Sequence, residues 1–148
     1  MFHLSRKIYS PLLIIFLILA GTNACKDEYN SVIPYVSVNM NINPTNFIEL
    51  NIPGGSYYFA NAGYGGIILF RDLTDNSNPF LAFDAACTHE ISTTTRVGAD
   101  QSGLATCPVC KSQFILFGGN GNPIKGPAIE ALRQYKTTYT GGRIIISN

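Results

Sequence analysis

The chain has 148 residues, enough for one domain with a hydrophobic core but not for two ordinary domains plus a targeting segment. Its formal net charge is +1, and it becomes −1 when Arg6 and Lys7 of the N-terminal segment are left out. The remaining basic residues form no stripe, which argues against a nucleic-acid partner. Only 13% of residues are charged, while glycine, asparagine, threonine and tyrosine are frequent. This composition predicts an all-β protein.

The first 24 residues are expected to be a signal peptide. Basic Arg6 and Lys7 precede an apolar run of nine residues from Leu12 to Ala20, and small or polar residues follow up to Cys25. A transmembrane helix needs about 20 apolar residues, so this run is too short to be a permanent span. We therefore expect the chain to be exported.

The segment that ends at Cys25 resembles a bacterial lipoprotein signal, in which the cysteine is diacylated and becomes the mature N-terminus. Ala24 suits this pattern, whereas Thr22 and Asn23 depart from it, and the alternative is an ordinary small residue near a signal cleavage site. The resemblance implies a lipid anchor in a bacterial membrane, and the following "KDEYN" resembles a tag for the outer membrane. We expect residues 25–31 to be the lipidated cysteine and its tether, and 32–148 to be the folded domain.

Short strands are expected along the rest of the chain, because apolar residues alternate with polar ones between turn-forming residues. Before the first cysteine of the folded domain, the expected strands are 35–42, 46–52, 56–62, 65–72 and 79–85, with a polar turn over 73–78. After the last cysteine come a strand over 113–117, a turn-rich stretch over 118–128, a single helical turn over 129–134, and two strands over 135–140 and 143–147.

The last two strands are joined through Gly141 and Gly142 and are expected to form a hairpin. Closely spaced short strands without a long helical period favour a small antiparallel sandwich or barrel.

Two pairs of soft donor residues form the main candidate site. Cys87 and His89 are followed, after seventeen residues, by Cys107 and Cys110. Two loops that each present two such donors suit a single metal centre. The residues alone leave open a zinc ion, an iron–sulfur cluster, a disulfide between Cys107 and Cys110, or buried cysteines beside an unrelated histidine.

The motifs around these donors resemble a Rieske iron–sulfur domain. They are "CTH" (87–89), "CPVCKSQF" (107–114), "GNPIKGPA" (121–128) and "LRQY" (132–135), and the resemblance covers most of the chain from about Val32 to Ser147. It implies a small antiparallel sandwich or barrel with a cluster-binding subdomain of two loops. It also implies a 2Fe–2S cluster as the cofactor.

Two positions depart from the Rieske pattern. Cys110 stands where the family has its second histidine, and Lys111 stands where it has glycine. Carried over residue by residue, the resemblance gives one iron to Cys87 and Cys107 and the other to His89 and Cys110. Since cysteine is a competent iron ligand, the site is changed but not evidently lost.

The third cysteine affects the expected reduction potential. With three thiolates the oxidised cluster carries one net negative charge, whereas two cysteines and two histidines give a neutral cluster and four cysteines give two negative charges. More negative charge disfavours adding an electron. We therefore expect a potential below the range of ordinary Rieske centres, about −150 to +300 mV, and above or near that of plant-type ferredoxins, about −400 mV.

Two neighbours of the donors are candidates for tuning the site. The resemblance implies that Ser112 donates a hydrogen bond to a cluster sulfur, and the alternative is a turn serine that satisfies backbone groups. Lys111 offers a positive charge near the extra thiolate, and the alternative is a solvated loop lysine.

The sequence favours an electron carrier over an enzyme with its own substrate site. With His89 used as a ligand no triad of two histidines and a carboxylate can be built, and quinol oxidation is disfavoured because Ser92 and Val109 occupy the places of a family disulfide. The expected partners are a redox protein of unknown identity and the membrane, with no evident small-molecule substrate. The competing hypothesis is a Rieske scaffold without a cluster, which holds zinc, a disulfide or no metal and acts as a binding or structural lipoprotein.

Overall fold

The computed structural model describes residues 31–74 and 77–148, and Ser31–Asn148 forms one compact unit. The expected signal peptide (1–24), the expected lipidation residue Cys25 and residues 26–30 of the expected tether lie outside the described residues. Among the residues it describes, no helix is both long and apolar enough to cross a membrane.

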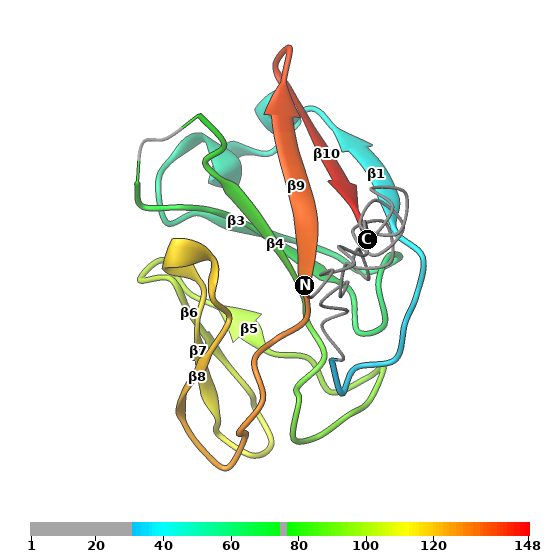
Figure 1. Ribbon diagram of the computed structural model, residues 1–148. Coiled ribbons are helices and arrows are strands. Elements are labelled where there is room, and N and C mark those ends of the chain that lie inside the picture. Colours follow the sequence, from blue (N-terminus) through cyan, green and yellow to red (C-terminus); the bar gives the residue numbers. More distant parts are fainter. Residues whose placement is uncertain (1–30, 75–76) are drawn as a thin grey trace, which may run out of the picture. The chain divides into compact units, whose positions relative to one another are not determined.

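The described chain is all-β and forms two antiparallel sheets (Figure 1). The larger sheet has the strand order β1-β10-β9-β4-β3-β2, made of β1 (Asn39–Ile42), β2 (Ser56–Phe59), β3 (Ile67–Arg71), β4 (Phe80–Asp84), β9 (Gln134–Thr140) and β10 (Arg143–Ser147). The smaller sheet has the order β5-β6-β7-β8, made of β5 (Gly98–Ala99), β6 (Leu104–Thr106), β7 (Gln113–Ile115) and β8 (Pro123–Lys125). The predicted fold class is confirmed.

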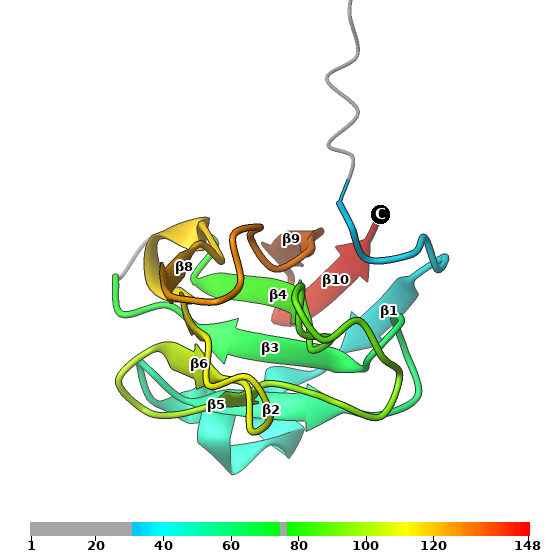
Figure 2. The same ribbon diagram turned by 90° about the horizontal axis from the view of Figure 1, so that it is seen from below.

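Strand β3 lies inside the larger sheet, between β2 and β4 (Figure 2), and both of its faces are buried. Ile67 and Leu69 point into a core cluster shared with β1, β9 and β10, whereas Ile68 and Phe70 point into a second cluster shared with the smaller sheet. Alternate side chains of a strand face opposite sides, so a strand buried on both sides needs an unbroken apolar run. This explains the sequence "IILF".

The predicted C-terminal hairpin is confirmed, because β9 and β10 pair antiparallel with Thr140 opposite Arg143. Gly141 and Gly142 both have positive φ, at 56° and 73°. A two-residue hairpin turn of the favoured type needs positive φ at both positions, and glycine adopts it without steric cost.

The prediction of a strand over 46–52 is wrong. Two 3-10 helices stand there instead, η1 (Pro44–Asn46) and η2 (Ile48–Asn51). Leu50 is fully buried and Phe47 packs against the same core, while Ile48 between them is 80% exposed. Residues three apart share a face of a 3-10 helix, so this apolar spacing serves the helix as well as it would a strand.

Other expected elements differ in extent. The strand expected over 35–42 is regular only over β1. The helical turn expected over 129–134 is not formed, and Leu132 instead donates its backbone N–H to Gly121 O at 2.9 Å. Arg133 O in turn accepts from Asp84 N at 2.8 Å. The turn-rich 118–128 contains β8, and the strands β5 and β6 between the two ligand pairs were not predicted from the sequence.

Candidate metal centre

The first ligand loop begins at the end of β4 and is anchored by the buried carboxylate of Asp84. Its two oxygens accept four hydrogen bonds of 2.7–2.9 Å, from the backbone N–H groups of Tyr64, Gly65 and Ala86 and from the Tyr135 hydroxyl. The pKa of Tyr135 is raised, mainly by burial and to a lesser extent by the hydrogen bond and the negative charge of Asp84. This hydroxyl therefore stays protonated and continues to donate. Cys87 follows three residues later and is therefore held at the base of the loop.

The second ligand loop is a tight turn between β6 and β7. Cys107 N donates to Ser112 O at 2.9 Å, and Lys111 N donates to Cys107 O at 3.1 Å. Lys111 has φ of +64° and is the one non-glycine residue with positive φ in the part of the chain that the structure describes. Its ammonium Nζ donates to Pro108 O at 2.6 Å, so the side chain folds back over the turn.

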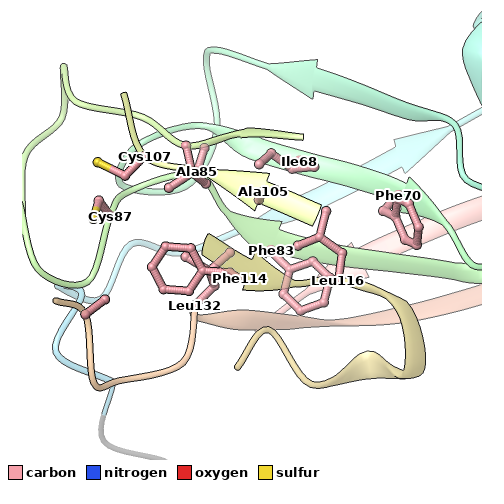
Figure 3. Close-up of a cluster of buried hydrophobic side chains, with 12 residues drawn as sticks. Ile68, Phe70, Phe83, Ala85, Cys87, Ala105, Cys107, Phe114, Leu116 and Leu132 are labelled. Carbon is pink, nitrogen blue, oxygen red and sulfur yellow. The ribbon is translucent and has the colours of Figure 1, made fainter. Parts of the chain in front are cut away.

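The two loops bring together three of the four predicted donors. The Sγ atoms of Cys87, Cys107 and Cys110 all lie within 4.8 Å of one another, and those of Cys87 and Cys110 are 3.5 Å apart. Cys87 and Cys107 are fully buried at one end of the core cluster between the sheets (Figure 3). Cys110 is half-buried, and all three are free thiols.

His89 is not part of this group. Its side chain is 45% exposed, and Nε2 lies 3.8 Å from the Glu90 carboxylate. The imidazole follows Cys87 by two residues on the same loop, beyond the segment that Asp84 anchors. Its assignment as the fourth ligand thus stays a prediction.

Ser112 links the second loop to the "GPA" turn. It is fully buried, and its Oγ accepts hydrogen bonds from Ala128 N at 2.8 Å and from the Cys110 thiol at 3.1 Å. The serine therefore satisfies a backbone group, which is the alternative role given above, and it also contacts a predicted ligand. Donation from Ser112 to a cluster sulfur stays a prediction. When Cys110 is a thiolate, the hydroxyl proton of Ser112 can turn towards that sulfur.

Thr88 gives the first loop a similar link, because its hydroxyl donates to Glu130 O at 2.7 Å. Neither Thr88 nor Asp84 was singled out from the sequence. Asp84 had a usable signal, since it is the one charged residue in the apolar run "FLAFDAAC", and a charge in a buried strand needs several partners.

The pKa shifts of two cysteines run in opposite directions. Burial raises the pKa of Cys87 to about 12. Desolvation also opposes ionisation of Cys110, but hydrogen bonds from Ser112 and then from the neighbouring thiols outweigh it and lower the pKa of Cys110. Of these two thiols, Cys110 is the one that ionises first.

The donor set fits the cofactor that the fold implies. Three cysteine sulfurs are ligands that iron–sulfur clusters accept, and they equally suit zinc. The hydrophobic cluster behind Cys87 and Cys107 would keep water from that side of a bound group.

A cleft of about 900 Å³ lies beside the second loop. It runs between β2 and the β5–β6 pair and is lined by Tyr58, Arg96 and Pro108, among others. The Arg96 guanidinium lies over the Tyr58 ring, 4.7 Å from its centroid. The Tyr58 ring thus borders this open cleft.

No protein-family model and no curated protein matches the sequence. Among solved structures, the plasma membrane Rieske protein of Synechocystis PCC 6803 has a TM-score of 0.57 at 24% identity, covering 74% of this chain and 99% of that chain. The ferredoxin of carbazole 1,9a-dioxygenase from Nocardioides aromaticivorans IC177 has a TM-score of 0.50 at 18% identity, covering 76% of this chain and 98% of that chain.

A third similar structure is a chain from the complex of reduced oxygenase and oxidised ferredoxin in carbazole 1,9a-dioxygenase, with a TM-score of 0.52 at 16% identity. It covers 80% of this chain and 94% of that chain. The described domain therefore has the Rieske fold, as the motifs around the cysteines and His89 predicted.

Proposed function

We propose that this chain is an exported, membrane-anchored electron-transfer protein that holds a Rieske-type 2Fe–2S cluster with Cys87, His89, Cys107 and Cys110. The observation that carries the proposal is the convergence of three cysteine sulfurs within 4.8 Å at the paired loops of a Rieske fold. The cluster, when bound, supplies one-electron chemistry at a potential that its ligands and their surroundings set.

The chain's own residues divide into an inner and an outer pair of donors. Cys87 and Cys107 are fully buried and would hold the inner iron, shielded by the core. Cys110 is half-buried and His89 is exposed, so the outer pair would face a partner. Ser112 fixes the position of Cys110, and Asp84 fixes the strand end that leads to Cys87.

The proposal predicts a reduction potential lower than that of ordinary Rieske centres, between about −400 and −150 mV, because of the third thiolate. His89 would be the single imidazole available to couple proton and electron transfer. Protein-film voltammetry at several pH values measures both quantities. A potential near the positive end of the Rieske range would contradict ligation by three cysteines.

The first experiment is metal analysis of the full chain carrying Cys25→Ser, purified anaerobically. About two irons and two sulfides per chain, with a reducible rhombic EPR signal, are expected. Cys110→His should give ordinary Rieske spectra and a higher potential, and the matched control Cys110→Ser should keep neither the wild-type spectrum nor the Rieske one. One zinc or no metal in the wild type would overturn the proposal.

A second candidate function is a binding or structural lipoprotein whose Rieske scaffold holds one zinc ion. It is favoured by the exposed position of His89 and by the close approach of the three sulfurs, since tetrahedral zinc with bonds of about 2.3 Å places its sulfur ligands about 3.8 Å apart. The same metal analysis separates the two candidates, because zinc gives no EPR signal and no reducible chromophore.

The partner and the location are part of the proposal. Two of the similar structures are a dioxygenase ferredoxin and an oxygenase–ferredoxin complex, and another is a plasma membrane Rieske protein. By analogy, we propose a redox protein as the partner. From the lipoprotein-like segment that ends at Cys25, we propose a lipid anchor in the outer membrane. Mass spectrometry of the mature N-terminus after radiolabelled palmitate feeding tests the anchor.

A further inference from the structure

The second ligand loop carries a cation whose position is unusual for a lysine. Lys111 lies between Cys110 and Ser112, with φ of +64°, a conformation that disfavours any residue with a Cβ. Glycine would adopt it freely, so a lysine there is kept at a conformational cost. An outlier of this kind at a functional loop points to a role for the side chain.

The lysine ammonium contacts the loop backbone from an exposed position, and no acid pairs with it. Its Nζ donates to Pro108 O at 2.6 Å, inside the turn that presents both Cys107 and Cys110. Within the described residues, the one contact between a basic side chain and a carboxylate is that of His89 with Glu90, so Lys111 has no carboxylate partner there. The ammonium therefore contacts the backbone of the ligand loop and no carboxylate.

We propose that Lys111 is a charge-compensating residue, whose ammonium offsets the negative charge that the Cys110 thiolate adds to the site. The charge arithmetic is direct, because one ammonium cancels the one net negative charge of an oxidised cluster with three thiolates. A nearby cation also favours the reduced state, which is more negative still, and so raises the reduction potential. The effect on the reduction potential rests on the proposed function. The electrostatic effect of the Lys111 ammonium on the Cys110 thiolate does not.

The electrostatic effect of Lys111 at Cys110 can be measured without a cluster. The measurement is the rate of thiol–disulfide exchange of the reduced, metal-free full chain carrying Cys25→Ser. The half-buried Cys110 is the accessible thiol of the three, and peptide mass spectrometry confirms the labelled residue. Its thiolate attacks the reagent disulfide, forms a mixed disulfide and releases the reagent's thiolate. We take the ratio of the rate with anionic dithiobis-nitrobenzoate to the rate with neutral dithiodipyridine. Because both rates are proportional to the fraction of Cys110 that is ionised, that fraction cancels in the ratio.

Lys111→Met should lower this rate ratio about threefold to tenfold at low ionic strength, and added salt should shrink the difference. Lys111→Arg should keep the wild-type ratio. The matched control is Lys136→Met on β9, which removes the same charge elsewhere and should leave the ratio unchanged. An equal ratio in wild type and Lys111→Met overturns the proposal, whatever metal the protein binds.

The cluster-loaded protein tests the second half of the proposal. In Lys111→Met the reduced-to-oxidised ratio at a fixed potential should fall about threefold to tenfold, and Lys111→Arg should restore it. An unchanged reduced-to-oxidised ratio in the cluster-loaded protein, together with a changed ratio of the two reagent rates, would overturn the effect on the reduction potential. It would leave the electrostatic effect of Lys111 on Cys110 established. Wild-type protein that contains no iron would sink the proposed function, while the reagent ratio would still decide the role of Lys111.

Discussion

The two loops that carry the predicted ligands are positioned in different ways. The second loop is short and closes on itself through two backbone hydrogen bonds between Cys107 and the residues at 111 and 112. The first loop is long and is anchored at its base by Asp84, while His89 lies beyond that anchor. The three cysteines lie within or beside these hydrogen-bonded segments, and their sulfurs come together. His89 lies outside the segments and does not join them.

Spacing along the chain therefore identifies candidate ligands without fixing the directions of their side chains. Cys87 and His89 are only two residues apart, yet the first is fully buried in the core and the second is exposed. The local backbone anchors decide which donor is held in place. Substitutions in each loop can test this contrast, as follows.

The largest effect is expected at the base of the first loop. Asp84→Ala leaves several buried backbone N–H groups and a buried hydroxyl without an acceptor, and it should lower the free energy of unfolding by about 3 kcal/mol or more. Urea denaturation of the metal-free protein measures the change. Asp100→Ala, at an exposed turn aspartate that also accepts several hydrogen bonds, should cost about 1 kcal/mol. Equal costs would refute the anchoring role of Asp84.

In the second loop, Ser112→Ala removes the acceptor of the buried Ala128 N–H and should lower the free energy of unfolding by about 1–3 kcal/mol. Thermal or urea unfolding measures it. The control is Ser92→Ala in the first loop, where the half-buried hydroxyl accepts from Thr94 N at 3.1 Å and the loss should be under about 1 kcal/mol. A smaller loss at Ser112 than at Ser92 would contradict the buried bridge.

A smaller effect on the free energy of unfolding is expected from backbone strain at Lys111, and two uncharged substitutions measure it apart from the charge. Because its φ is positive, Lys111→Gly should be more stable than Lys111→Ala by about 1 kcal/mol. At the exposed Lys125 in β8 the order should reverse, with glycine less stable than alanine. Paired urea titrations of the four variants give both differences. Glycine less stable than alanine at both positions would show that the turn at Lys111 is not left-handed.

The smallest effect on stability is expected at His89. Its exposed side chain should allow His89→Ala to change the free energy of unfolding of the metal-free protein by less than about 0.5 kcal/mol. The EPR signal of the cluster-loaded protein should nevertheless change if His89 is a ligand. An unchanged signal would remove His89 from the ligand set and favour a different fourth donor.

Much of the scaffold could be predicted from local pattern. The apolar runs of β3 and β4 and the double glycine of the last hairpin carry strong signals, because burial on both faces and positive φ leave few alternatives. The motif with Cys87, Cys107 and Cys110 identified the site. These features depend on residues close together in the chain.

The features that escaped prediction depend on distant partners. The segment 46–52 alternates like a strand but is helical, because Phe47 and Leu50 both pack into the core cluster that residues of β1, β3, β9 and β10 form. Strands β5 and β6 are short and hold their places by pairing, which local sequence does not report. The exposure of the His89 side chain is likewise not evident from its spacing of two residues from the buried Cys87.

The double-sided burial of β3 has a consequence for how the domain comes apart. Since Ile67 and Ile68 belong to different core clusters, neither sheet can separate without exposing apolar surface on the shared strand. We expect the amide hydrogens of β3 to exchange with solvent last, through global opening, while those of the first ligand loop exchange earlier through local opening. The first ligand loop would then open and close many times while β3 behind it keeps its hydrogen bonds.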